Sequence, residues 1–135
     1  MSIEANKAVV RRYQQAINDH DWDVLDHVLA DDIATPLIMP GFPAGREGAK
    51  AIARATVEPW PDFHTEIDEL IAEEDRVVAL VTMTGTAMKP GFGLPGTGKP
   101  FTVKGAYIVR IADGVIVEHA GVEDALGMVA QITGS

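Results

Sequence analysis

The sequence contains no cysteine and few basic residues. The first absence excludes disulfide bonds, thiolate nucleophiles and cysteine-based zinc sites. Only 11 Lys and Arg face 20 Asp and Glu, which gives a formal net charge of −9 at pH 7. Because phosphate groups are bound by basic surfaces, we expect neither a nucleic-acid partner nor an anionic-membrane partner. A nonpolar or cationic small molecule is compatible with this charge.

Long apolar runs are also lacking. The longest are far too short to cross a bilayer, and the opening "MSIEANKAVVRRYQQ" has the pattern of a polar-faced helix, with no apolar signal-peptide region. We therefore expect a cytoplasmic protein without membrane association. Hydrophobic residues make up 47% of the 135 residues, which suffices for a substantial core, so we predict a single domain over residues 1–135.

The first part of the chain has helical periodicity. Apolar residues recur at helical spacing over 3–19, behind Ser2 as a candidate N-cap. A second helix is predicted over 22–29, capped by Asp21. A third is predicted over 46–58, where the prolines that follow stop it. Between the second and third helices, "IATPLIMPGFPAG" has three Pro and two Gly, which predicts an extended or looped, strongly apolar segment.

After Pro61 the hydrophobic period changes to two, which indicates strands. The predicted strands cover 63–68, 76–88, 101–111 and 114–121, and the last two are joined by a hairpin turn at Ala112-Asp113-Gly114. A short closing helix follows, with Leu126, Val129 and Ile132 on one side. Three helices followed by hairpin-connected strands predict an α+β domain.

The segments "GREG", "ELIAEEDRVVALVTMTGT", "GTGKPFT", "IVRIADGVIVEH" and "LGMVAQI" follow one another in an order that resembles the SnoaL-like polyketide cyclase family. The similarity covers nearly the whole chain. It implies the cone-shaped fold of ketosteroid isomerase and nuclear transport factor, in which a curved antiparallel sheet wraps around the N-terminal helices and encloses an apolar pocket. It also implies homodimers. Because this fold hosts cyclases, isomerases, dehydratases, epoxide hydrolases and non-catalytic binders, function depends on the site.

Strand alternation predicts which side chains face the pocket. On the strand over 101–111, the apolar set should point inward: Phe101, Val103, Gly105, Tyr107, Val109 and Ile111. On the last strand, the inward set should be Val115, Val117, His119 and Gly121, and the outward set Ile116, Glu118 and Ala120.

The resemblance also exposes a departure at the site. Cyclases of this family use an acid/base Asp two residues after the His of "VIVEH", assisted by a His on the preceding strand. Aligned through "VRIADGVIVEH", these positions hold Gly121 and Tyr107. Both catalytic groups are absent, so the aldol-type proton transfer of those cyclases does not carry over to this chain.

Three polar residues are candidates for catalysis in their place. His119 is the only His predicted to point inward, and its ordinary pKa suits a general base near neutral pH. Tyr107 could donate a hydrogen bond to a carbonyl or enolate oxygen. Asp124 could orient the imidazole. The alternatives are a satisfied core histidine, a packing tyrosine and a helix N-terminal aspartate.

The remaining candidates are apolar and would bind the substrate or pack in the core. They are Tyr13, Ile17, Met39, Trp60, Val81, Met83, Phe101 and Val103. Family members often carry acidic or His residues in the segment that here runs from Ala34 to Met39, so this pocket should be unusually apolar. No His-x-His or Glu-x-x-His pair is present, which argues against a metal, and we expect no cofactor.

Two functions remain open. The first is a cofactor-independent acid/base enzyme of cyclase, isomerase or dehydratase type, acting on a small hydrophobic, polyketide- or steroid-like carbonyl compound. The second is a non-catalytic hydrophobic-ligand binding protein that has lost the cyclase Asp. An epoxide hydrolase is disfavoured, because Arg110 is assigned to the outer face. That face, with Leu80, Thr82, Thr84, Thr86, Ile108 and Ile116, is semi-apolar and predicts a homodimer.

Overall fold

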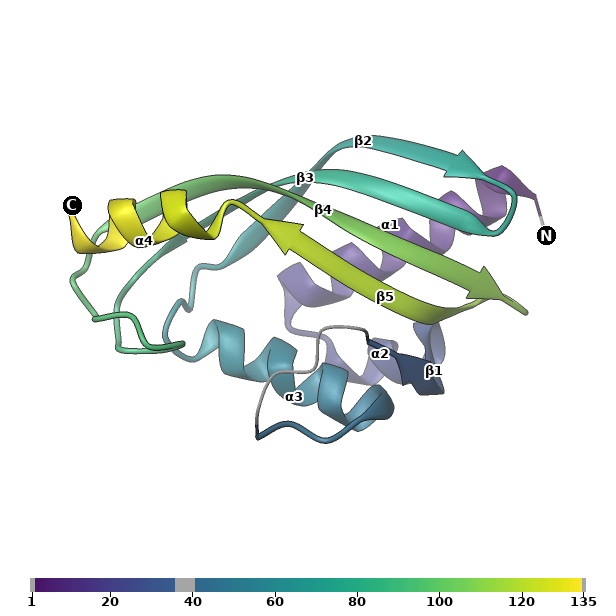
Figure 1. Cartoon of the computed structure of the whole chain (residues 1–135). Coiled ribbons are helices and arrows are strands. Elements are labelled where there is room, and N and C mark those ends of the chain that lie inside the picture. Colours follow the sequence, from purple (N-terminus) through teal and green to yellow (C-terminus); the bar gives the residue numbers. More distant parts are fainter. Residues whose placement is uncertain (1, 36–40, 135) are drawn as a thin grey trace.

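A curved sheet covers three helices on its concave side (Figure 1). The computed structural model describes residues 2–35 and 41–134. In these residues the chain forms four helices and one five-stranded sheet, as expected for an α+β fold. The helices α1, α2 and α3 lie under the sheet, and the C-terminal α4 lies beside the start of β4 (Figure 1).

The helices follow the sequence signals closely. They are α1 (Ile3–Asp19), α2 (Trp22–Val28), α3 (Gly45–Val57) and α4 (Ala125–Thr133). Ser2 caps α1, because its hydroxyl accepts a hydrogen bond from the Ala5 N–H at 3.0 Å. Asp21 caps α2 in the same way through the Val24 N–H. Both predicted caps are confirmed.

The strands are β1 (Leu29–Ala34), β2 (His64–Glu73), β3 (Arg76–Thr86), β4 (Pro100–Ala112) and β5 (Val115–Glu123). Their order in the sheet is β1-β5-β4-β3-β2. The four long strands pair antiparallel, as predicted, but β1 pairs parallel with β5. The expected purely antiparallel sheet is therefore a mixed one, and Leu29 begins a strand instead of ending α2.

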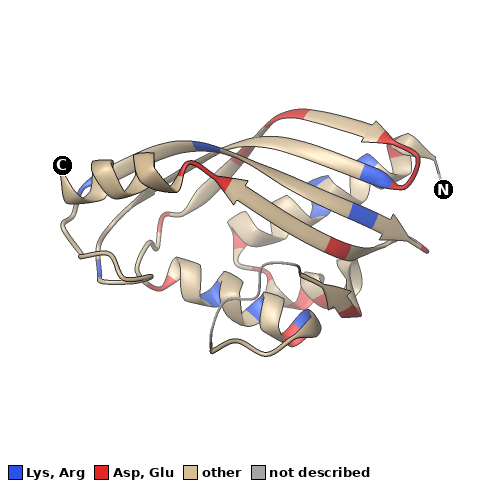
Figure 2. Cartoon of the chain, in the orientation of Figure 1, with Lys and Arg blue, Asp and Glu red and all other residues tan. Residues whose placement is uncertain are grey.

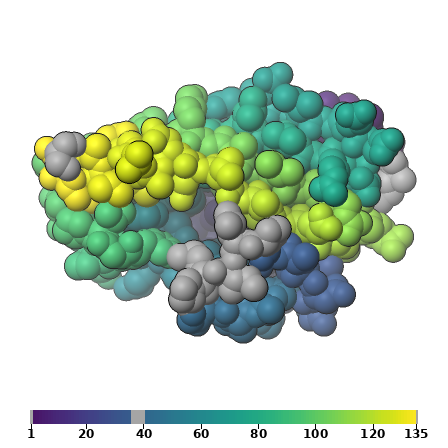
Figure 3. Space-filling view, viewed as in Figure 1, coloured from purple at the N-terminus to yellow at the C-terminus, as the bar shows by residue number. Residues whose placement is uncertain are grey.

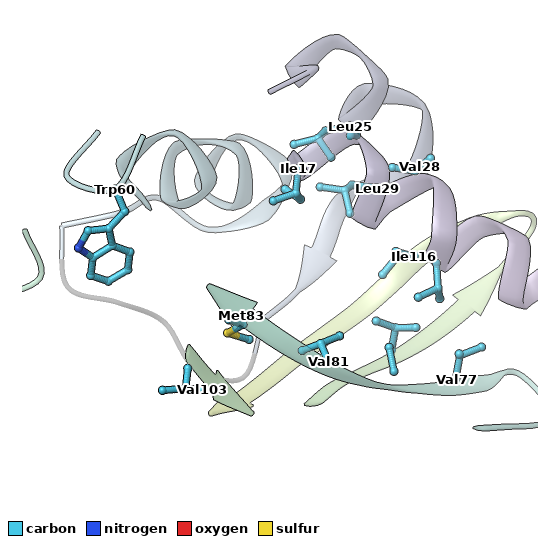
Figure 4. Close-up of a cluster of buried hydrophobic side chains, with 14 of the residues drawn as sticks. Ile17, Leu25, Val28, Leu29, Trp60, Val77, Val81, Met83, Val103 and Ile116 are labelled. Carbon is cyan, nitrogen blue, oxygen red and sulfur yellow. The ribbon is translucent and has the colours of Figure 1, made fainter. Parts of the chain in front are cut away.

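The hydrophobic core lies between the inner face of the sheet and the helices. Figure 4 shows Leu25 and Val28 of α2 with Ile17 of α1, near Val81 and Val77 of β3. Each of these side chains is at most 8% exposed. Burial of one Val or Leu side chain contributes about 1.5–3 kcal/mol, so this cluster holds the sheet on the helices. Trp60 and Met83 lie at one end of it, toward the pocket (Figure 4).

A β-bulge changes the predicted alternation at the start of β5. Arg110 pairs with Glu118 but Ile111 pairs with Ile116, so Val117 is the extra residue. The inward assignment therefore holds from Glu118 onward but is wrong before it, and Ile116 is fully buried instead of facing outward. The closing helix also differs from the prediction, because Met128 and Ile132 form its buried side whereas Leu126 is 85% exposed.

Candidate functional site

The concave side of the sheet contains an apolar pocket of about 520 Å³. The pocket opens between α4 and α3. Figure 3 shows the opening as a hollow below the yellow α4, with purple atoms of the N-terminal part of the chain visible inside it. The pocket is lined by residues from α1, α3, β3, β4, β5 and α4, and from the loops before β2 and β4. Its wall includes Tyr13, Ile17, Ala49, Ile52, Ala53, Trp60, Phe63, Met83, Phe92, Leu94, Tyr107, His119, Gly121, Glu123, Met128 and Val129. Mainly apolar walls of this size suit a small organic ligand.

A second hollow of about 530 Å³ lies between α1 and β2. It is lined mostly by polar and charged groups, such as Arg11, Gln15, His64 and Glu66. His64 is exposed there and lies 3.1 Å from Glu66, as its place on the polar face of the strand predicted. Because the walls are polar and open to water, we place the candidate site in the apolar pocket instead.

His119 is the polar centre of the apolar pocket. β5 directs its side chain inward, opposite Val109 of β4, and its ring packs against two phenol rings. The ring centroids lie 5.3 Å from Tyr13 and 5.4 Å from Tyr107. The Nε2 atom is buried and has no hydrogen-bond partner among the residues the structure describes. Burial lowers the pKa of His119 to about 4, so the imidazole is neutral at pH 7.

The two effects on the His119 ring are opposed. Burial lowers its pKa, and the backbone of the same residue raises it by a smaller amount. Nε2 has no partner of its own in the described residues.

The two phenols complete this end of the pocket. Tyr13 of α1 and Tyr107 of β4 meet edge to face, with ring centroids 6.1 Å apart. Burial raises the pKa of Tyr107 to about 12; the Thr65 side chain lowers it and the carboxylate of Glu123 raises it further. Burial also raises the pKa of Tyr13. Both hydroxyls therefore keep their protons at neutral pH and can donate hydrogen bonds.

Thr65 is held in place by α1. The Oδ1 atom of Asn18 accepts hydrogen bonds from the Thr65 N–H at 2.9 Å and from its hydroxyl at 3.4 Å. The Nδ2 of Asn18 and the Nε2 of Gln14 both donate to the Thr65 carbonyl. Thr65 is fully buried, so these bonds satisfy its backbone and fix the hydroxyl near Tyr107.

Gly121 faces Tyr107 directly across the β4–β5 ladder. A Cβ atom at Gly121 would lie 3.7 Å from the Tyr107 Cδ1 and 4.0 Å from the His119 Cε1, which are ordinary contacts. The backbone would thus accept a side chain here. Because Gly121 has no side chain, the space beside the His119 ring is part of the pocket.

The structure does not bring Asp124 together with His119. Asp124 is the N-cap of α4: its Oδ1 accepts a hydrogen bond from the Gly127 N–H at 2.9 Å, and the residue is exposed. Its side chain is not part of the pocket wall. The helix-terminal alternative describes this residue, and we assign it no orienting role.

The predicted substrate-binding residues divide into two groups. Tyr13, Ile17, Trp60 and Met83 line the pocket. Val81, Phe101 and Val103 do point inward, but they are packed into the core and do not reach the pocket wall. Met39 lies outside the described residues.

Sequence reasoning missed several pocket residues, and Glu123 is the most important one. It shares the inward face of β5 with His119 and Gly121, because the three positions are two residues apart. Glu123 is exposed where it lines the pocket, and partial burial raises the pKa of its carboxyl group. The strand period, extended two residues further, was the available signal. The contributions of α3, such as Ala49, Ile52 and Ala53, had no such signal.

In residues 2–35 and 41–134, no group of three or more His, Asp or Glu residues is placed to hold a metal ion. Arg110, the residue that an epoxide hydrolase would need in the cavity, lies on the outer face, where its guanidinium donates to Glu118 at 3.1 Å.

No helix in the described residues is long and apolar enough to cross a membrane.

Comparisons with solved structures agree with this architecture. TsrD from Streptomyces laurentii is 28% identical, with 100% of this chain and 99% of that chain covered and a TM-score of 0.90. IdmH from Streptomyces antibioticus is 27% identical, with 95% and 98% covered and a TM-score of 0.84. A SnoaL-like polyketide cyclase from Agrobacterium tumefaciens is 18% identical, with 95% and 96% covered and a TM-score of 0.80.

A search of curated proteins gave no significant match. The family model for SnoaL-like polyketide cyclases matches residues 7–132, which is nearly the whole chain and includes every residue placed in the pocket above. The chain belongs to the SnoaL-like polyketide cyclase family.

Proposed function

We propose that the pocket is the active site of a cofactor-independent acid/base enzyme that acts on a small, mainly apolar carbonyl compound. The reaction belongs to the cyclase, isomerase or dehydratase type. One observation carries the proposal: the buried, unpartnered Nε2 of His119 stands beside two phenol groups in an apolar pocket. A buried nitrogen without a partner costs free energy, and a substrate proton supplies the partner it lacks.

The chemistry needs a base and a hydrogen-bond donor on the same substrate. Nε2 of His119 removes a proton from the carbon next to the carbonyl group, so that the C–H bond breaks and its electron pair moves onto the carbonyl oxygen. The hydroxyl of Tyr107 donates a hydrogen bond to the enolate oxygen that forms. The carbanion then attacks a second carbonyl carbon, expels a leaving group, or takes the proton back at another carbon.

The pocket weakens the base and also protects the reaction. A pKa of about 4 makes the His119 imidazole a weaker base than free histidine, but it stays unprotonated throughout the neutral range. The imidazolium formed in the step is costly in the apolar pocket, so it returns its proton quickly. Exclusion of water by the bound substrate strengthens the Tyr107 hydrogen bond.

Proton exchange tests this role without knowledge of the natural substrate. The rate at which 1-tetralone exchanges its α-protons in D₂O is followed by NMR, with and without the enzyme. We expect the wild-type protein to accelerate exchange and the substitution His119→Ala to lower the acceleration by about 10²-fold, the usual contribution of a general base. Tyr107→Phe should lower it as well. Asp113→Asn, at the β4–β5 turn, is the matched control and should leave it unchanged.

The opposite results have distinct meanings. An unchanged rate in His119→Ala would remove His119 from the mechanism. Absence of acceleration by the wild-type protein, combined with tight binding of the ketone, would support the second candidate, a non-catalytic binding protein. That candidate is favoured by one observation: the directly paired Tyr107 and Gly121 occupy the positions where the family resemblance places the catalytic groups.

A further inference from the structure

We propose that Glu123 sets the substrate specificity of this pocket, by selecting apolar carbonyl compounds that carry a hydroxyl or protonated amine about 13 Å from the group that faces His119. The inference deepens the proposed function and rests on it. It assigns a polar recognition point to the outer end of the pocket, where the wall otherwise contributes Ala125, Met128 and Val129.

The distance follows from the strand. His119 and Glu123 are both on the inward face of β5 and both line the pocket. Four residues of extended strand span about 13 Å, and side chains of the same face leave the strand in parallel. Between them lies Gly121, which has no side chain to divide the space. The two polar groups therefore mark the two ends of one continuous apolar path.

Glu123 has no partner in the described part of the chain. It forms no hydrogen bond or ion pair with any residue in 2–35 or 41–134, and its side chain is exposed where it lines the pocket. The cations of the sheet are engaged elsewhere: Lys104 binds Asp68 and Thr82 on the outer face, and Arg110 binds Glu118. No cation of these strands therefore competes for the Glu123 carboxylate, and a protonated amine or hydroxyl of a ligand in the pocket can bind it.

Two simpler explanations for Glu123 do not account for its position. Acidic residues are common at helix N-termini, and residues 123–124 at the junction of β5 and α4 are both acidic (Figure 2). However, Asp124 alone supplies the capping hydrogen bond to the Gly127 N–H. Cross-strand pairing does not need the carboxylate either, because the residue opposite Glu123 is Gly105, which has no side chain to pair with it.

Three matched ligands test the inference by isothermal titration calorimetry at pH 8, where the carboxylate is ionised. The probes are 4-(5-aminopentyl)acetophenone, its neutral isostere 4-hexylacetophenone, and 6-(4-acetylphenyl)hexanoic acid. We expect the wild-type protein to bind the amine at least about tenfold more tightly than the neutral probe, the usual effect of a hydrogen bond to a charged group, and to bind the acid most weakly. Glu123→Gln should reduce the amine preference to within about twofold. Asp113→Asn removes one exposed negative charge and should keep the full preference.

The inference is overturned if the wild-type protein binds amine and neutral probes equally, or if Glu123→Gln keeps the preference. Either result leaves the proposed function standing, because the neutral ketone would still occupy the pocket and exchange its α-protons. Failure of all three probes to bind would overturn both proposals. A loss of the preference in Asp113→Asn would show that net charge, and not Glu123, causes it.

Discussion

At the scale of single residues, the pocket keeps a polar group in a state that costs stability. The imidazole of His119 is buried and neutral, and its Nε2 has no partner in the described residues. This arrangement does not improve folding, because burial penalises the charged ring and leaves the nitrogen without a hydrogen bond. Polar groups held at such a cost are concentrated in functional sites.

The shifted pKa of His119 predicts acid sensitivity of the fold. The unfolded chain binds the proton at a pKa of about 6.5, whereas the folded protein binds it only at about 4. Between these values the unfolded state holds more protons, so stability falls as the pH drops below about 6.5 and levels off near pH 4. The full shift corresponds to about 3 kcal/mol, and the partial opening of the pocket to water reduces this to about 1–3 kcal/mol.

This linkage is measured by urea unfolding of the wild-type protein and of His119→Gln at pH 7.5 and pH 4.5. The wild-type protein should lose more stability than the variant on acidification, by about 1–3 kcal/mol. Other groups titrate equally in both proteins, so the difference reports on His119. Equal losses would show that the ring is accessible to water in the folded state.

At the scale of elements, helix α1 positions the site as well as the core. Asn18 and Gln14 bind the backbone of Thr65 at the start of β2. The Thr65 side chain in turn lowers the pKa of Tyr107 through a hydrogen bond. One turn earlier, α1 contributes Tyr13 to the ring cluster with His119. The helix therefore connects the edge of the sheet to the polar centre of the pocket.

Truncation of Asn18 should loosen this connection. Asn18→Ala leaves the buried N–H of Thr65 without an acceptor, and an unsatisfied buried donor costs about 1–3 kcal/mol. Urea unfolding should show this loss, and amide exchange should become faster at the start of β2. Gln15→Ala is the control on the same helix, because Gln15 is exposed and, within the described residues, its side chain bonds only to Asp19. Equal stabilities of the two variants would contradict the positioning role.

The elements also show what the sequence can predict. Helices with strong periodicity and a cap, such as α1 behind Ser2, were located to the residue. The inner face of β4 was found as well, but β2 extends to Glu73, beyond its predicted end at residue 68. β1 was missed, because its only local signal is the pair Leu29 and Ile33 and its pairing partner is distant in the chain. The bulge at Val117 was missed for a related reason: an extra residue leaves no trace in the hydrophobic pattern of one strand.

The difference between local and distant signals also explains which site residues the sequence predicted. His119 and Tyr107 were found because both follow the alternation of regular strands. Phe101 and Val103 follow that alternation too, but whether an inward side chain meets the core or the pocket depends on how far the helices lie from the sheet. The sequence does not encode that distance locally. The inward face was therefore predictable, and its division into core and pocket was not.

At the scale of the whole molecule, the outer face of the sheet carries an apolar patch. In the ladder, Ile71 pairs with Val78, Val78 with Ile108, and Ile108 with Ala120; in the next row, Leu80, Ala106 and Val122 pair in turn. Ile71 and Val122 are 50% and 55% exposed. Ile116, expected on this face, is buried on the other side, and Val122 takes part in the patch instead. A patch of this extent on a sheet is typical of an interface.

We propose that a second copy of the chain covers this patch. Two ion pairs flank the patch: Lys104 with Asp68 on one side, and Arg110 with Glu118 on the other. Such an arrangement can complement itself across a two-fold axis, because each positive group can lie against a negative group of the second copy.

Sedimentation velocity between 5 and 200 μM tests the dimer. The wild-type protein should sediment as a dimer, and Ile108→Lys should sediment as a monomer with an unchanged circular dichroism spectrum, because a buried, unpaired ammonium at the centre of a two-fold interface is strongly unfavourable in both copies. Gln15→Lys adds the same charge on α1, away from the sheet, and should stay dimeric. A wild-type monomer, or an Ile108→Lys dimer, would contradict the proposal. The patch and the pocket lie on opposite faces of β4 and β5, so the monomeric variant should still bind ketones. If the dimer stiffens these strands, the wild-type protein should bind ketones more tightly than the monomeric variant does.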